Sequence, residues 1–146
     1  MEFQVEVLEE SFKAILPKEE AFAAAFYDRL FAAHPEVKRL FSGVDMGGQS
    51  EKLVGALAVV VENLRRPEVL EPVLRKLGKQ HAGYGVKPAH YDAVGAALLG
   101  TLAAFLGSRW TSEVKTAWGM AYGAISSLML QGATAGAAGN LAAGAA

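Results

Sequence analysis

Apolar side chains recur every three or four residues along most of this 146-residue chain. That spacing places them on one face of an α-helix, whereas the alternation typical of a β-strand is absent from the sequence. The segments that show it are 2–16, 18–34, a short stretch from Pro35, 49–64, 73–81, 88–106 and 112–131. The sequence therefore predicts an all-α domain with seven to eight helices of unequal length.

Glycine and proline mark the predicted breaks between these helices. Ser42–Gly48 (SGVDMGG) predicts a loop, so we expect the following helix to begin at Gln49. Pro67 and Pro72 predict short helical pieces at the start of the next segment, because proline lacks the N–H of a helix interior. Thr111 is a candidate N-cap for the last helix, since its hydroxyl can accept a bond from a free backbone N–H.

The composition excludes several classes of function. The chain carries 14 basic and 15 acidic residues and so lacks the basic excess of a nucleic-acid-binding protein. It has no cysteine, which excludes disulfides and thiolate chemistry. The longest apolar run, about nine residues around Ala56–Val61, is too short for a membrane span, and the acidic N-terminus has no signal-peptide pattern. We therefore expect a cytoplasmic protein without a membrane span.

One helical stripe ends in a histidine. Leu70, Leu74, Leu77 and His81 share a helical face, and two glycines within the next four residues are expected to stop the helix. The chain has three histidines, and no two have the spacing of a helical metal site, which argues against an ion held by protein side chains alone. From the residues alone, His81 is either a packed core histidine or the ligand of a metal within a cofactor.

Two other polar residues leave the same choice open. Tyr27 lies beside the apolar stripe of 18–34, where a tyrosine is either a core aromatic or a ligand-binding group. Gln49 lies one turn before Leu53 on the same helical face, where a glutamine is either solvated or directed into a pocket. Neither residue settles its role by itself.

The ordered set of motifs resembles one family. Between Val5 and Gln131 the motifs are FYDRLF, HPEVKRLF, QSEKL, LGKQHAGYGV, HY and AWGMAYG. This series resembles the globins, specifically the single-domain bacterial hemoglobins and the heme domain of flavohemoglobins. The resemblance implies a globin fold in which helices enclose a heme in a three-on-three arrangement. We accordingly expect a globin domain over 1–131 and a frayed or disordered Gly/Ala-rich tail over 132–146.

The resemblance also implies roles for individual residues. His81 would be the axial ligand of the iron in heme b, with its other ring nitrogen bonded to a backbone carbonyl or a side chain. Phe41 would pack flat on the porphyrin, and Tyr27 and Gln49 would reach over the open face of the iron. The other residues expected to line the heme pocket are Leu53, Leu77, Val86, Tyr91 and Val94.

A tyrosine and a glutamine over the iron imply tight, reversible O₂ binding for storage, delivery or sensing. Bound O₂ carries partial negative charge, so each donor is worth roughly 1.5–3 kcal/mol, or about ten- to more than a hundred-fold in affinity. NO and CO are the other expected diatomic ligands. The alternatives are a nitric oxide dioxygenase that depends on a separate reductase, and a heme-free interaction module. We favour ligand binding over catalysis.

Two departures from the flavohemoglobin pattern bear on this choice. Flavohemoglobins pair a tyrosine with a glutamate of the last helix to polarise the proximal histidine; Tyr91 matches the tyrosine, whereas the glutamate position falls at Ala133. Weaker polarisation of His81 disfavours peroxidase-like activation. The sequence also ends where a flavin and NADH reductase domain would begin, so we expect any reductase to be external. The candidates for contact with the heme propionates are Lys76, Lys79 and Lys87.

Overall fold

The computed structural model describes residues 4–145, and the side chains of residues 4–134. This part of the chain is helical and contains no strand, which confirms the predicted all-α class. The α-helices are α1 (Val5–Ile15), α2 (Glu19–Ala33), α3 (Pro35–Lys38), α4 (Met46–Glu62), α5 (Pro67–Gly83), α6 (Pro88–Leu106) and α7 (Ser112–Ala145). Short 3₁₀ turns are η1 (Leu16–Lys18), η2 (Arg39–Phe41) and η3 (Gly107–Arg109).

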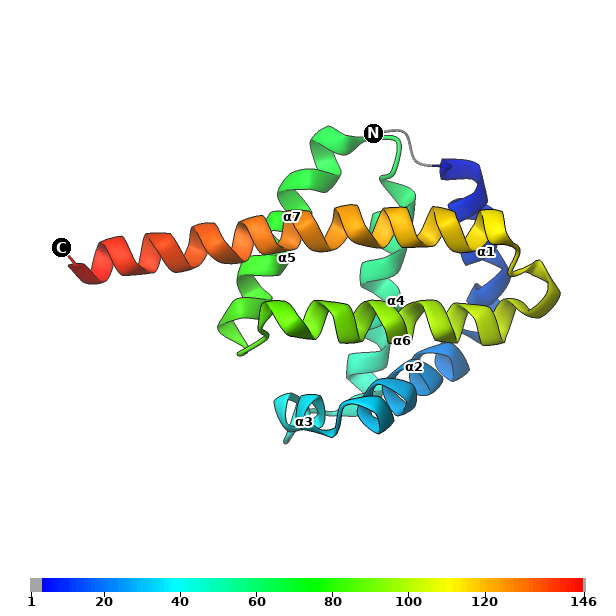
Figure 1. The fold of residues 1–146 in the computed structure, drawn as a ribbon, viewed down its shortest axis with the longest axis horizontal. Helices are drawn as coiled ribbons and strands as arrows, with labels where there is room; N and C mark the ends of the chain where they lie inside the picture. Colours follow the sequence, from blue (N-terminus) through cyan, green and yellow to red (C-terminus); the bar gives the residue numbers. More distant parts are fainter. Residues whose placement is uncertain (1–3, 146) are drawn as a thin grey trace.

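The helices form two crossing layers. Helices α6 and α7 run side by side, and α2 packs on α6; α4 and α5 cross behind the α6–α7 pair (Figure 1). Helix α5 packs mainly on α7, whereas α4 packs on α2 and α1, and α4 and α5 have no extended contact with one another. Helices α4 and α5 are therefore each positioned by other helices rather than by one another.

A buried hydrogen-bond chain joins the first helix to the last. The indole Nε1 of Trp118 on α7 donates to Ser11 Oγ at 2.8 Å, and Ser11 Oγ donates to the Val7 carbonyl at 2.7 Å. The Trp118 side chain is 3% exposed, so this N–H requires a partner within the protein. The bond positions α1 against α7, on which α5 also packs.

A close helix crossing positions α5. A Cβ atom on Gly78 of α5 would collide with the Met129 carbonyl of α7, so only glycine permits this approach. The crossing also explains why the prediction of short pieces before residue 73 is wrong. Helix α5 is continuous through Pro72, and we attribute this to packing along α7, which compensates for one missing backbone hydrogen bond.

The start of α4 also differs from the prediction. The helix begins at Met46 rather than at Gln49, because the Asp45 carboxylate accepts hydrogen bonds from Gly47 N at 3.2 Å and Gly48 N at 3.3 Å. This is an N-cap, which satisfies two backbone donors and lets the two glycines form the first turn. Gln49 is consequently held in the helix, with its N–H bonded to the Asp45 carbonyl at 2.9 Å.

Two features bear on the remaining sequence predictions. The segment Pro88–Arg109, which is α6 with η3, is long and apolar enough to cross a membrane by length and composition, yet here it packs between α2 and α7. Helix α7 extends through Ala145 and projects beyond the other helices (Figure 1). The side chains of 135–146 lie outside the described part, so the predicted domain boundary at 131 stays a prediction.

Candidate functional site

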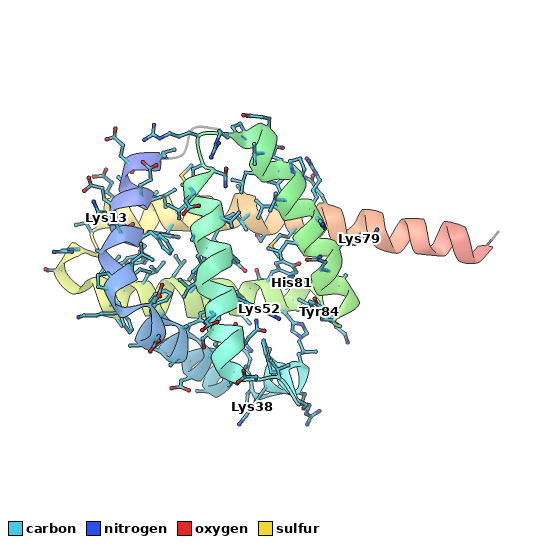
Figure 2. All side chains as sticks on the ribbon, turned by 180° about the vertical axis from the view of Figure 1, so that it is seen from behind. Lys13, Lys38, Lys52, Lys79, His81 and Tyr84 are labelled. Atoms are coloured by element: carbon cyan, nitrogen blue, oxygen red, sulfur yellow. The ribbon has the colours of Figure 1, made fainter. Side chains whose placement is uncertain are left out.

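His81 lies in the last turn of α5 and is half-buried. Figure 2 shows it on the side of α5 that faces α4. Its Nδ1 is 2.7 Å from the Leu77 carbonyl oxygen, one turn earlier on the same helix. Because a carbonyl can only accept, Nδ1 carries the proton and donates, which leaves the Nε2 lone pair of the neutral ring free. This is the orientation that a metal-ligating histidine requires.

The backbone that follows His81 turns back toward the His81 carbonyl. The N–H groups of Tyr84 and Val86 both donate to the His81 carbonyl, at 3.0 and 3.1 Å. Gly83 remains within the helix, and the chain turns at Gly85, whose φ of +91° favours glycine. The turn brings half-buried Val86 next to the histidine end of α5.

Tyr27 and Gln49 form a hydrogen-bonded pair between α2 and α4. Gln49 Nε2 donates to the Tyr27 hydroxyl oxygen at 3.2 Å. Tyr27 is 6% exposed, and burial raises the pKa of its hydroxyl while the bond from Gln49 partly opposes this rise. Within the described residues no acceptor takes the Tyr27 O–H. The neutral hydroxyl can therefore donate to a ligand beside it.

The ring of Phe41 packs against the ring of Tyr27. Its ring centroid lies 5.5 Å from that of Tyr27 at an interplanar angle of 66°, and 5.3 Å from that of Phe31. Edge-to-face contacts of this kind hold aromatic rings in a defined orientation. Phe41 ends the η2 turn and is half-buried, so part of its ring remains available to another group.

The elements that carry these groups also carry many apolar side chains. Half-buried apolar side chains come from α4, α5, the α5–α6 turn and α6, and those predicted as pocket residues are Leu53, Leu77, Val86 and Val94. No group of three His, Asp or Glu residues in the described part could hold a metal ion. An iron ion would therefore need a cofactor that supplies most of its ligands. A free imidazole Nε2 on a helix that also carries apolar side chains fits heme, which supplies four nitrogen ligands and a flat apolar ring.

Tyr91 has a buried hydroxyl that lacks a partner. The residue is 7% exposed, and its Oη is the buried side-chain oxygen for which no hydrogen-bond partner exists in the described part. The Tyr122 hydroxyl donates instead to the Tyr91 backbone carbonyl at 2.7 Å. Such an unpaired hydroxyl is costly in the protein alone and is consistent with a bound group that supplies the partner.

The structure brings the predicted residues into two groups. Tyr27 contacts both Gln49 and Phe41, while His81 contacts Leu77 and the turn that carries Val86. No hydrogen bond in the described part joins the two groups, and Tyr91 is not bonded to His81. The roles of these residues as heme and ligand contacts stay predictions.

Sequence reasoning missed three residues near the site. The capping role of Asp45 had a usable signal, since an aspartate that precedes the first turn of an apolar stripe is a common N-cap. Tyr84 lies beside His81, with ring centroids 6.1 Å apart, and is 71% exposed. Tyr122 packs its ring where a Cβ on Gly95 would collide with it, at 2.6 Å. No local pattern in the sequence indicates the contacts of Tyr84 or Tyr122.

Comparison with known proteins gives one family. The family model "Globin" matches residues 24–129. A flavohemoprotein of Rhizobium meliloti is 37% identical over 106 residues, which cover 71% of this chain and 26% of that protein. A flavohemoprotein of Rhodopirellula baltica is 30% identical over 128 residues, which cover 86% of this chain and 31% of that protein. The chain thus spans about a quarter to a third of the length of these curated relatives.

A solved structure agrees with the family match. The bacterial globin from Campylobacter jejuni superposes with a TM-score of 0.78 at 26% sequence identity. The match covers 90% of this chain and 94% of that one. The resemblance inferred from the ordered motifs is therefore confirmed, and so is the predicted fold.

Proposed function

This chain belongs to the globin family, whose fold binds heme, and we propose that it holds heme b through His81 and binds O₂ tightly and reversibly. The observation that carries the proposal is the Tyr27–Gln49 hydrogen bond at 3.2 Å, which leaves the buried tyrosine hydroxyl free to donate. The heme would supply an iron at which O₂ acquires partial negative charge. Storage, delivery and sensing of O₂ all use this chemistry.

Each side chain has a distinct part in this proposal. His81, oriented by the Leu77 carbonyl, would present Nε2 to the iron. Tyr27 would donate its O–H to the ligand, and Gln49 would orient the tyrosine and add an amide donor of its own. Leu53 would exclude water from the ligand, which strengthens these hydrogen bonds in the low-dielectric pocket. Glutamine is also a poor iron ligand beside histidine, so the sixth position would stay open in the ferrous state.

The test measures O₂ release from the purified heme protein. A Soret absorption band would establish heme binding, and displacement of O₂ by CO in stopped flow gives the dissociation rate. Tyr27→Phe should accelerate O₂ dissociation about tenfold or more, because it removes a charge-assisted donor. An unchanged rate would exclude Tyr27 as the donor, and no Soret band would exclude the heme function altogether.

The pH dependence gives a second readout from the same measurement. Because burial raises the pKa of Tyr27 above its ordinary value of 10.0, the hydroxyl keeps its proton through the neutral and mildly alkaline range. We expect the O₂ dissociation rate to stay constant from pH 7 to about pH 9. A rise in that rate between pH 7 and 9 would indicate that a different group is the donor.

A nitric oxide dioxygenase is the second candidate, because several relatives are flavohemoproteins, which combine a flavin and a heme as their name states. In that reaction NO and bound O₂ form nitrate, and an electron donor then returns the iron to the ferrous state. Sustained NO consumption with an added reductase would favour the enzyme. Consumption that stops after a few equivalents per heme would favour the O₂-binding protein.

A further inference from the structure

The outer face of α5 carries exposed apolar residues that no described part of the chain covers. Val69, Val73, Lys76, Gln80 and Tyr84 follow one another at intervals of three or four residues and are all exposed. Among them Val69 is 42% exposed, Val73 41% and Tyr84 71%. This second stripe lies about a quarter of a turn around α5 from Leu70 and Leu74, which are buried in the core. We call these five residues the outer face of α5.

The outer face of α5 lies within a basic region. Between Glu71 and Asp92 the sequence has no acidic residue but has four basic ones, Arg75, Lys76, Lys79 and Lys87, in a chain whose net charge is −1. Arg75 forms an ion pair with Glu71, whereas no ion pair in the described part includes the three lysines. Exposed apolar side chains beside unpaired lysines favour a partner with an acidic surface.

The same face ends beside the proposed iron ligand. The ring centroids of Tyr84 and His81 are 6.1 Å apart, and the Tyr84 backbone N–H donates to the His81 carbonyl at 3.0 Å. Figure 2 shows the two side chains at the same end of α5. A protein that covers Tyr84 would therefore come close to the heme edge, which is the requirement for electron transfer between proteins.

We propose that the outer face of α5, with Lys79 beside it, docks an acidic one-electron donor protein that carries a reduced flavin or iron–sulfur cluster. This inference rests on the proposed binding of heme by His81. One electron would pass from the donor to ferric iron held by His81, and the donor would be oxidised by one electron. Tyr84 is the central contact, because exposed tyrosines combine a large apolar ring with a polar tip and are enriched at protein interfaces.

Two other occupants fit the face less well. A second copy of the chain joined through this face would bring two copies of the same basic region together, and like charges across an interface oppose association. An anionic membrane would attract the lysines, but membrane binding does not require Tyr84 to lie beside His81. Both are outcomes of the experiment below.

The experiment measures reduction of the ferric heme protein under anaerobic CO, with an acidic, fully reduced flavodoxin as the donor. Appearance of the ferrous–CO spectrum in stopped flow gives the rate. Lys79→Glu should lower the second-order rate about tenfold at low ionic strength, and salt should reduce this difference. Lys13→Glu is the matched control, since Lys13 lies on α1, far from Lys79 and Tyr84 (Figure 2), and should leave the rate close to that of the parent protein.

A further variant and a second reductant distinguish an effect on protein docking from an effect on the reduction of the iron itself. Tyr84→Ser should slow reduction by flavodoxin several-fold, while its reduction by dithionite, which needs no docking surface, should stay unchanged. Equal effects of Lys79→Glu and Lys13→Glu, or rates that do not respond to salt, would overturn the proposal. Loss of the Soret band in the parent protein would instead remove the proposed function, so the two failures are distinguishable.

Sedimentation and vesicle binding complete the test. The heme protein should sediment as a monomer and should not bind vesicles of phosphatidylglycerol at physiological salt. A dimer that Lys79→Glu dissociates would assign the face to a second copy. Vesicle binding that Lys79→Glu and Tyr84→Ser abolish would assign it to a membrane. Either result would replace the donor protein as the occupant.

Discussion

The two sides of the proposed pocket are constructed differently. On the α5 side, His81 is oriented by a carbonyl four residues earlier on its own helix. On the α4 side, Tyr27 and Gln49 are 22 residues apart in sequence, come from two helices, and meet through one hydrogen bond supported by the ring of Phe41. The histidine side therefore depends on one helix, whereas the tyrosine side depends on how two helices and a turn pack together.

The largest expected effect comes from removing the histidine. His81→Ala should abolish stable five-coordinate heme, because no other histidine in the described part lies on the apolar face of α5. Added imidazole should restore the ferrous spectrum by occupying the space left by the side chain. His34→Ala is the control, since His34 pairs with Glu36 on the exposed surface, and it should leave the spectrum unchanged. Normal heme affinity in His81→Ala would exclude His81 as the iron ligand.

The next effect concerns cooperation on the tyrosine side. Gln49→Leu should accelerate O₂ dissociation several-fold to about tenfold, because one polar contact to the ligand and the orientation of Tyr27 are lost together. The double variant with Tyr27→Phe should be less than additive, since the two side chains are hydrogen-bonded. Strictly additive effects on the logarithm of the rate would show that Gln49 and Tyr27 act on the ligand separately.

The same contrast explains what the sequence could predict. The position of His81 on the apolar face of α5 follows from helical spacing alone, and its bond to the Leu77 carbonyl is the kind that the globin resemblance implied. The predicted start of α4 at Gln49 is wrong, because Gly47 and Gly48 look like a loop in the sequence unless the N-cap at Asp45 is recognised. Contacts such as Tyr122 with the Tyr91 carbonyl depend on how α6 and α7 cross, which spacing within one helix does not specify.

A smaller effect should follow from loss of the cap that positions Gln49. Asp45→Ala removes the acceptor for Gly47 N and Gly48 N and should lower the free energy of unfolding by about 1 kcal/mol. O₂ dissociation should accelerate slightly, because the first turn of α4 carries Gln49, while the heme spectrum set by His81 stays the same. Asp45→Asn, which keeps a capping oxygen, should recover most of the stability measured by urea unfolding. A changed heme spectrum in Asp45→Ala would show that the two sides are not independent.

The smallest expected effect tests whether the bound group satisfies Tyr91. Its hydroxyl is buried without a partner in the described part of the chain, so Tyr91→Phe should raise the urea stability of the heme-free protein by up to about 1 kcal/mol. In the heme-loaded protein this gain should disappear, because the hydroxyl is expected to lie beside the heme on the His81 side. Tyr122→Phe is the matched control: its hydroxyl donates to a backbone carbonyl at 2.7 Å, so its loss should cost about 1 kcal/mol with or without heme. An equal gain for Tyr91→Phe in both forms would mean that heme leaves the hydroxyl unpaired, and the histidine side would then depend on the Leu77 carbonyl alone.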